Sequence, residues 1–577
     1  MKKLLIYLKG YGKECVLGPL FKLLEAIFEL LVPLVVTSII DVGIANEDTG
    51  YILKCCGILV ALALIGLICA VTAQFFAARA ATGCSARLRG ALFAHLQSLS
   101  YSEVDTLGTS TMITRMTSDV NQVQNGVNLA LRLLLRSPFV VFGAMIMAFT
   151  IDFSSAMVFV AVIPVLLLVV FSIILMAIPM YRRAQQGLDG VTAATRENLT
   201  GVRVLRAFRK EEDEIRRFSG LNGSLNRLQL RVGRISNLMN PVTYVILNLA
   251  VVALIHRGAI QVNTGILTQG QTVALYNYMS QILVELIKFA NLIITMTKAV
   301  ACGNRIEKIL EVRSSQIPGT EKVPAHAPRG QVEFRQVGMV YAGAGEEALS
   351  QVSFLAKPGQ TIGIIGGTGS GKTTLVNLIP RFYDASQGQV LVDGVDVRTL
   401  DPEDLRKRIG VVPQKAVLFR GTIRSNLLWG KESATEEELS RALDIAQASE
   451  IIQNKEMGLD SPVEQGGTNF SGGQRQRLTI ARALVRQPEI LILDDSASAL
   501  DHATDAKLRS AIRGLKNPPT TFIVSQRAAS MLHADWILVL DDGQVVGQGT
   551  HRELLESCHI YREIYHSQFR KEVEGHG

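Results

Sequence analysis

Long apolar runs in the first 300 residues limit the folds open to this chain more than any other feature. A helix that crosses a lipid bilayer needs about 20 apolar residues. Residues 156–178 contain no charge at all, and helices in soluble cores rarely reach that length without one. We therefore predict an α-helical, polytopic membrane domain with six spans. Their approximate ranges are 14–40, 53–80, 131–150, 156–180, 236–256 and 271–297.

Lysine and arginine residues gather on one side of the predicted spans. Segment 181–235 carries twelve of them. Three loops on the other side, 41–52, 151–155 and 257–270, together carry a single one. The N-terminal segment adds Lys2, Lys3, Lys9 and Lys13. Because loops rich in lysine and arginine stay in the cytoplasm, we expect the N-terminus, both long loops and the C-terminal half to be cytoplasmic.

The composition argues against nucleic-acid partners and cysteine-based sites. The net charge of +8 follows from the loop bias, and no cluster of arginine and aromatic residues indicates a groove for bases. The seven cysteines form no C-x-x-C pair. We therefore expect buried, reduced thiols, with neither a metal site built from cysteine nor a disulfide framework.

A glycine-rich loop marks the C-terminal half as a nucleotide-binding domain. Residues 366–374 fit the pattern G-x-x-x-x-G-K-[ST], between an apolar strand at 361–365 and a predicted helix at 375–379. Backbone N–H groups of such a P-loop can surround a polyphosphate, and the helix N-terminus adds positive potential. Lys372 would reach the outer phosphates, and the Thr373 hydroxyl would hold Mg²⁺. The loop consists of Gly366, Gly367, Thr368, Gly369, Ser370, Gly371, Lys372, Thr373 and Thr374.

Two further motifs follow the P-loop in a specific order. The run 469–477 contains Ser471, Gly472, Gly473 and Gln474, and the apolar strand 490–494 ends in Asp494. A P-loop alone indicates only a nucleoside triphosphate. The three motifs together resemble the nucleotide-binding domain of ATP-binding cassette (ABC) transporters. The resemblance implies an ABC exporter fold, with the membrane domain followed by an α/β P-loop NTPase domain that binds ATP and Mg²⁺.

The resemblance also assigns roles to residues outside the P-loop. Tyr341 follows the strand 331–334, where an aromatic residue stacks on adenine in this family. Gln414 matches the Q-loop, which touches Mg²⁺ and faces the membrane domain. Asp494 would bind Mg²⁺ through water, and 498–501 matches the D-loop.

The Ser471–Gln474 signature implies a second chain. Family members work as a sandwich in which each ATP lies between one domain's P-loop and the other domain's signature. This chain carries one nucleotide-binding domain, so the resemblance implies that it is half of a transporter. In Ser471–Gln474, the glycines would allow close approach to the γ-phosphate and Ser471 would add a hydroxyl donor.

Two cytoplasmic loops resemble those that couple the domains of ABC exporters. They lie within 88–119 and 197–218, and the family pattern places short coupling helices near 101–111 and 206–216. Residues 305–330 are rich in helix breakers toward their end and are predicted to be a linker. The expected domains are therefore the membrane domain 1–304 and the nucleotide-binding domain 331–577.

Two residues depart from the family pattern close to the γ-phosphate. Active members carry a glutamate after the strand-end aspartate, and here Asp495 is one methylene shorter. That loss is roughly 1.5 Å of reach, and about 1 Å of misplacement can slow a reaction on the order of 10²-fold. Active members also carry a histidine in the switch loop, and Gln526 cannot carry its positive charge. We predict that this P-loop holds ATP and hydrolyses it poorly.

The intact signature and the altered catalytic positions resemble the degenerate-site subunit of bacterial heterodimeric multidrug ABC exporters. We therefore expect an ATP-driven exporter of hydrophobic or amphiphilic compounds, paired with a non-identical half-transporter in a bacterial plasma (inner) membrane. Four alternatives remain: a lipid or lipopeptide flippase, an importer of metal chelates, an ATP-gated channel or regulator, and a homodimer with two slow sites.

Charged residues within the predicted spans are candidates for substrate contact, because charges at membrane depth are costly. Glu29 or Glu285 would line a cavity for cationic amphiphiles. The alternative for Glu285 is a pair with Lys288, one helical turn away, that neutralises itself. Arg132 and Arg136 are expected to extend toward the cytoplasmic interface. Glu25 lies in the first span with Glu29.

Overall fold

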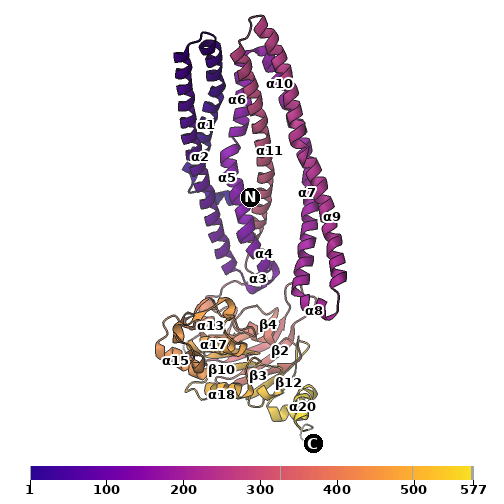
Figure 1. Cartoon of the computed structure of the whole chain (residues 1–577). Coiled ribbons are helices and arrows are strands. Elements are labelled where there is room, and N and C mark those ends of the chain that lie inside the picture. Colours follow the sequence, from indigo (N-terminus) through magenta and orange to yellow (C-terminus); the bar gives the residue numbers. More distant parts are fainter. Residues whose placement is uncertain (1, 325, 497, 574–577) are drawn as a thin grey trace. The chain divides into compact units, whose positions relative to one another are not determined.

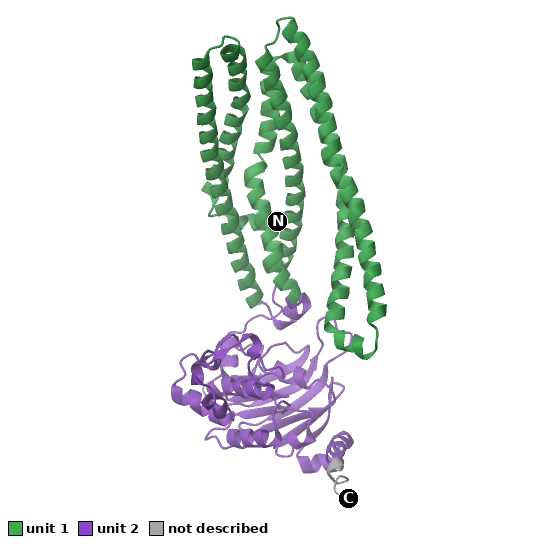
Figure 2. Cartoon of the chain, in the orientation of Figure 1, with its two compact units in different colours: residues 1–97, 110–312 green, residues 98–109, 313–577 purple. Residues whose placement is uncertain are grey.

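A computed structural model describes residues 2–324, 326–496 and 498–573, which belong to two compact units (Figures 1 and 2). The first unit contains the chain up to Gln97 and Ser110–Val312. The second contains Ser98–Thr109 and the chain from Arg313 onward. A short stretch of the N-terminal half therefore folds with the C-terminal half.

The first unit is helical, as predicted. Among the described residues, six helices are long and apolar enough to cross a membrane, and each contains one predicted span. By element they are α1 (Gly12–Ser38) with the π-helical η2 (Ile39–Ile44); α2 (Thr49–Ser98); α4 (Thr109–Thr114), η3 (Arg115–Asp119), α5 (Val120–Leu133) and α6 (Arg136–Ile151); α7 (Phe153–Thr200); α9 (Glu211–Asn237) and α10 (Met239–Asn263); and α11 (Gln269–Glu311). A 3₁₀ helix, η1 (Lys2–Leu8), precedes them.

The long helices extend beyond the apolar runs. The 50 residues of α2 are about 75 Å long at 1.5 Å per residue, whereas a bilayer's hydrocarbon core is about 30 Å thick. The long loops are therefore continuations of membrane helices, as the sequence indicated. In the same way α11 continues to Glu311, inside the segment expected to be a linker.

Helix α11 lies at the centre of the membrane unit and packs against α1, α5, α6 and α10. Its side chains Tyr278, Met279 and Ile282 are fully buried. The hydroxyl of Tyr278 donates to the carbonyl of Leu30 in α1 at 2.7 Å. Aromatic and aliphatic packing, with one satisfied hydroxyl, thus holds α11 against α1.

The second short loop helix lies a few residues earlier than predicted. Helix α8 spans Val202–Ala207, whereas the sequence placed a coupling helix near 206–216. Four acidic residues, Glu211 to Glu214, occupy the first turn of α9. Negative charge stabilises a helix N-terminus, so this cluster favours a new helix at 211, and the left-handed φ of 53° at Arg209 separates it from α8.

The second unit contains two main sheets. The six-stranded sheet has the order β12-β11-β3-β10-β9-β6, and the antiparallel four-stranded sheet has the order β2-β1-β4-β5. The strands are β1 (Val332–Met339), β2 (Leu349–Ala356), β3 (Thr361–Gly366), β4 (Gln387–Val392), β5 (Val395–Asp396), β6 (Ile409–Val412), β7 (Gly421–Thr422), β8 (Pro462–Val463), β9 (Ile490–Asp494), β10 (Thr520–Val524), β11 (Trp536–Asp541) and β12 (Gln544–Gly549).

Helices surround these sheets. They are α3 (Tyr101–Leu107), α12 (Lys372–Leu378), α13 (Pro402–Arg408), α14 (Ile423–Leu428), α15 (Glu436–Ile445), α16 (Ser449–Gln453), α17 (Gly472–Val485), α18 (His502–Arg513), α19 (His551–Ser557) and α20 (His559–Val573). One core includes the stacked rings of Phe334 and Phe354, whose centroids are 4.6 Å apart, and the buried Phe522 of β10. This core joins the two sheets and holds the ends of the central strands in place.

Candidate functional site

Five neighbouring strands of the large sheet, from β11 to β6, run parallel, and the predicted site residues follow the carboxyl ends of four of them. These four are β3, β10, β9 and β6. In the pairing of β10, Val524 lies opposite Ile364 of β3 and Asp494 of β9. Ligands of open α/β sheets bind at this edge. The topology therefore gathers the P-loop, the switch loop, the strand-end carboxylates and the Q-loop.

These residues line one cavity of about 320 Å³. Predicted residues that line it are Tyr341, Thr368, Gly369, Gly371, Lys372, Thr373, Thr374, Gln414, Asp494, Asp495 and Gln526. Ala348, Val524 and Ser525, which the sequence did not single out, complete the lining. Gly366 is the last residue of β3, and Gly367 and Ser370 lie in the loop between β3 and α12.

The P-loop folds tightly around the Lys372 ammonium. Its Nζ donates to the carbonyl of Gly366 at 3.0 Å and to the hydroxyl of Ser370 at 3.3 Å, and it also contacts the Gly367 carbonyl. Gly371 has a φ of 91°, and a Cβ there would lie 2.5 Å from the carbonyl oxygen of Ala348. Burial lowers the pKa of Lys372, and the carboxylates of Asp495 and Asp494 oppose that shift.

Oxygen atoms suited to a magnesium ion lie beside the lysine. The Thr373 hydroxyl donates to Asp494 Oδ1 at 3.1 Å. Burial raises the pKa of Asp494; the Thr373 bond opposes this shift, and the charge of Asp495 adds to it. Mg²⁺ is usually held by one or two carboxylates together with substrate phosphates. The hydroxyl and carboxylate of this pair fit such an ion, whose charge would offset the two neighbouring carboxylates.

Asp495 occupies a strained position. Its φ of 44° lies in the left-handed region that non-glycine residues seldom adopt. The backbone N–H of Asp495 donates to the carbonyl of Val524 at 3.0 Å, and its Oδ2 accepts from the Gln414 amide at 3.4 Å. Strain of this kind persists where the surroundings hold the residue. The backbone thus aims the shorter carboxylate at the Q-loop.

Tyr341 and the signature lie in different parts of the unit. The Tyr341 hydroxyl donates to Thr374 Oγ1 at 3.0 Å, at the P-loop helix. Ser471 is the N-cap of α17, where it accepts from the Gln474 N–H at 3.2 Å, and both residues are outside the lining of the cavity. A Cβ on Gly472 would meet no atom within 4 Å. The N-terminus of α17 therefore has open space beside Gly472.

Comparisons with known proteins agree with this geometry. A family model described as the ABC transporter transmembrane region matches residues 15–286, and one described as ABC transporter matches 349–498. The chain is 36% identical over 572 residues to the uncharacterised ABC transporter ATP-binding protein YfiB of Bacillus subtilis, covering 99% of each chain. The chain belongs to the ABC transporters.

Other proteins similar to this ABC transporter are named for different functions. It is 33% identical to the probable multidrug resistance protein YheH of B. subtilis, over 84% of this chain and 72% of that protein. It is 29% identical to the ATP-dependent lipid A-core flippase of Chromobacterium violaceum, over 98% and 97%. A bacterial Atm1-family ABC exporter with ATP bound has the same fold, with a TM-score of 0.80, 23% identity and coverage of 96% and 98%.

The ABC transporter is therefore an ATP-hydrolysing, multi-pass membrane protein with the exporter fold. One membrane domain and one nucleotide-binding domain make it a half-transporter. The fold class expected from the sequence is confirmed.

In this half-transporter, helix α3 packs on the nucleotide-binding domain through aromatic residues. The ring of Tyr101 lies 4.8 Å from that of Phe382 and 6.1 Å from that of Tyr383. The Tyr383 hydroxyl donates to Asp105 Oδ2 at 2.6 Å. Tyr383 also meets the ring of Tyr341 edge-on at 5.2 Å. The sequence predicted a docking helix here but not its partners, which lie near one another only after folding.

Replacing Tyr383 with phenylalanine should loosen α3 while keeping the ring contacts. Burial raises the pKa of Tyr383, as does its bond to Asp105, so the hydroxyl stays protonated and donates. A hydrogen bond to a charged group contributes about 1.5–3 kcal/mol. Hydrogen exchange of the amides in Tyr101–Leu107 should become several-fold faster. Asp105→Asn should weaken the same contact, and adding it to Tyr383→Phe should change little further.

A buried ionic network occupies the membrane unit. Arg136 Nη1 donates to Glu285 Oε1 and Nη2 to Glu29 Oε2, each at 2.5 Å. Glu285 also accepts from Ser137 at 2.9 Å and from Lys288 at 2.8 Å. The network joins α1, α6 and α11.

These contacts correct two expectations about the charges. Arg136 is 5% exposed, so it is buried against carboxylates and does not extend to the interface. The side chain of Glu285 is 3% exposed and pairs with Lys288, which favours the self-neutralising alternative over a cavity wall. The side chain of Glu29 is 41% exposed, and one of its oxygens is held by Arg136.

Proposed function

We propose that this chain is the degenerate-site subunit of a heterodimeric ABC exporter of hydrophobic or amphiphilic compounds. The observation that carries the proposal is that Asp495 and Gln526 both line the cavity formed by the P-loop. The signature at Ser471–Gln474 keeps the family residues and lies at an open helix end. The partner would be a non-identical half-transporter whose P-loop this signature completes.

The two altered residues act on the same phosphate. Asp495 follows Asp494 at the end of β9, and Gln526 follows β10 on the adjacent strand. A shorter carboxylate misplaces the attacking water, and a neutral amide supplies less electrostatic stabilisation to the γ-phosphate than a charged imidazole. ATP would therefore bind at this P-loop, with Tyr341 on adenine, and would turn over slowly.

Magnesium would join the nucleotide to the carboxylates. Thr373 and Asp494 would hold the ion, the latter through water, and Gln414 would approach it from the Q-loop. The Gln414 amide donates to Asp495 Oδ2 at 3.4 Å, so the Q-loop reaches the residue that follows β9. The ion would neutralise charge that develops on the phosphate oxygens.

In the proposed cycle, ATP binding brings the two nucleotide-binding domains together and turns the membrane cavity outward. Hydrolysis at the partner's P-loop resets it. The loop charges and the bacterial relatives support cytoplasmic nucleotide-binding domains in a bacterial plasma membrane. Export as the direction of transport rests on the resemblance to ABC exporters. The similarity to YheH, a probable multidrug resistance protein, supports substrates of the multidrug type.

The purified chain alone should bind ATP with little hydrolysis. Replacing Asp495 with glutamate and Gln526 with histidine together should raise ATP hydrolysis at this chain's own P-loop. Glutamate extends the carboxylate toward water, and histidine restores a charged contact. Because both act on one transition state, single substitutions should do far less than the pair. Turnover is measured in a complex whose partner carries glutamine for its catalytic glutamate, so that only this site is active.

Two results would count against the proposal. Brisk hydrolysis by the single chain would remove the asymmetry, and the homodimer would then be preferred. No gain from the double substitution, against a partner with an intact Ser-Gly-Gly-Gln run, would mean that other residues silence the site. A control that changes Tyr341 to Ala should weaken ATP binding in the single chain.

Lipid or lipopeptide flipping is the second candidate. The match to a lipid A-core flippase over 98% of the chain favours it. Reconstitution in liposomes separates the two functions: dithionite bleaching of a fluorescent lipid reports flipping, whereas accumulation of a cationic dye in inverted vesicles reports export.

A further inference from the structure

The side chain of Gln568 in helix α20 contacts the switch loop, the segment from Ser525 to Ser530 that follows β10. Gln568 Nε2 donates to the carbonyl of Gln526 at 2.8 Å, and its Oε1 accepts from the N–H of Ala528 at 2.7 Å. One amide thus binds backbone groups on both sides of Arg527. The glutamine amide suits this pair of bonds, because it carries an N–H₂ donor and a carbonyl acceptor on one carbon.

Helix α20 is firmly attached to its unit, so it can serve as a support. Tyr561 is fully buried, and its hydroxyl lies 2.8 Å from His551 Nδ1 of α19. Ile564 and Tyr565 pack against the same hydrophobic core. These residues precede Gln568 by seven, four and three positions, which places all four on one face of the helix. The packing therefore holds Gln568 toward the switch loop.

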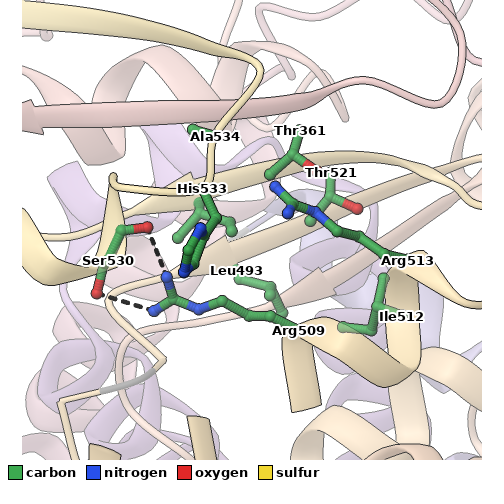
Figure 3. Close-up of a pocket in the computed structure, with 10 residues that line it drawn as sticks. Thr361, Leu493, Arg509, Ile512, Arg513, Thr521, Ser530, His533 and Ala534 are labelled. Carbon is green, nitrogen blue, oxygen red and sulfur yellow. Dashed lines mark hydrogen bonds between the residues drawn. The ribbon is translucent and has the colours of Figure 1, made fainter. Parts of the chain in front are cut away.

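The far end of the switch loop is also held. Figure 3 shows Arg509 of α18 bonded to Ser530, whose hydroxyl accepts at 2.8 Å and whose carbonyl accepts at 2.5 Å. The small pocket in this view shares no lining residue with the nucleotide cavity. Ser530 ends the 3₁₀ turn η6 (Ala528–Ser530). The segment after β10 is thus fixed by α18 at one end and by α20 near the other.

We propose that Gln568 is a positioning residue, which holds the backbone of Gln526 so that its side chain faces the γ-phosphate of bound ATP. The inference rests on the proposed contact between Gln526 and that phosphate. Without Gln568, a buried N–H and a carbonyl lose their partners and the loop can turn away from the cavity. The helix would then contribute to the distinction between ATP and ADP, although it lies outside the cavity lining.

The test compares nucleotide affinities of the full-length chain with Gln568→Leu, which keeps the side-chain bulk and removes both hydrogen bonds. The probes are a non-hydrolysable ATP analogue and ADP, each with Mg²⁺. Affinity for the analogue should fall roughly 5- to 10-fold, as loss of one or two hydrogen bonds implies, while ADP affinity stays unchanged. Gln526→Ala should produce the same pattern, and the double variant should add little.

A matched control and a second readout keep the outcomes distinct. Ser567→Ala changes the neighbouring residue, whose hydroxyl bonds only within α20 in the described contacts, and should leave both affinities alone. Equal loss of ATP-analogue and ADP affinity in Gln568→Leu would show a general structural role and overturn the proposal. Unchanged exchange of the Ala528 amide in that variant would also overturn it, whatever the affinities. If Gln526→Ala alone leaves the ATP preference intact, the proposed function of Gln526 fails, and the positioning role fails with it.

Discussion

Replacing Gly472 with aspartate should remove nearly all ATP turnover from the assembled transporter. The substitution puts a negative charge at the N-terminus of α17, where the partner's γ-phosphate would lie. Like charges placed together cost several kcal/mol, so turnover should fall on the order of 10²-fold or more. The chain itself should fold normally, because a Cβ at Gly472 meets no atom within 4 Å. Steady-state phosphate release by the complex measures the effect.

Lys372→Ala is the matching change on this chain's own P-loop. It removes a charge-assisted phosphate contact and should weaken ATP binding by the single chain, while the complex keeps part of its turnover. Gly472→Asp should leave ATP binding by the single chain intact. If Lys372→Ala stopped the complex and Gly472→Asp did not, the working site would belong to this chain and the proposed asymmetry would be reversed.

Replacing Arg136 with leucine should strongly destabilise the membrane domain. The change leaves the carboxylates of Glu285 and Glu29 without the cation that joins them. Breaking one partner of a buried ion pair costs about 3–5 kcal/mol. Thermal unfolding of the detergent-purified chain can be followed by far-ultraviolet circular dichroism, which reports loss of helix. The variant should show a clearly lower midpoint temperature.

Two variants control for the loss of positive charge and of packing. Arg132→Leu removes an arginine one helical turn earlier, where no ion pair is found among the described residues, and should change the midpoint little. Glu285→Gln added to Arg136→Leu should recover part of the stability, because it removes a buried charge that would otherwise lack a partner. Equal midpoints for Arg136→Leu and the unaltered chain would mean that the network does not hold these helices.

Local patterns were enough to predict the spans and the gathering of the nucleotide motifs. Apolar length identifies a membrane helix within its own sequence, and the motifs follow strands whose parallel order brings them to one edge. The contacts missed by the sequence join distant positions. Arg136 and Glu285 are 149 residues apart, and Gln568 and Gln526 are 42 apart. No local sequence pattern links the two residues of either pair, so only the folded structure reveals that these side chains meet.

The coupling helix was predicted by resemblance, while its neighbour α8 was placed too late. The family pattern carries no information on where a helix restarts. That choice depends on the acidic first turn of α9, which stabilises a start at Glu211. The arrangement of Asp495 also lay beyond prediction, since its left-handed φ accompanies a hydrogen bond to Val524, which is distant in sequence.

The membership of Ser98–Thr109 in the second unit has a consequence for synthesis of the chain. Asp105 leaves the ribosome 278 residues before Tyr383, its hydrogen-bond partner. Since domains generally fold in order from the N-terminus during translation, α3 must wait, with its aromatic contact surface uncovered, while four membrane spans are inserted. Helix α3 can therefore complete its contacts only late in translation, and a nascent chain stopped before residue 382 would leave α3 open to chaperones and proteases.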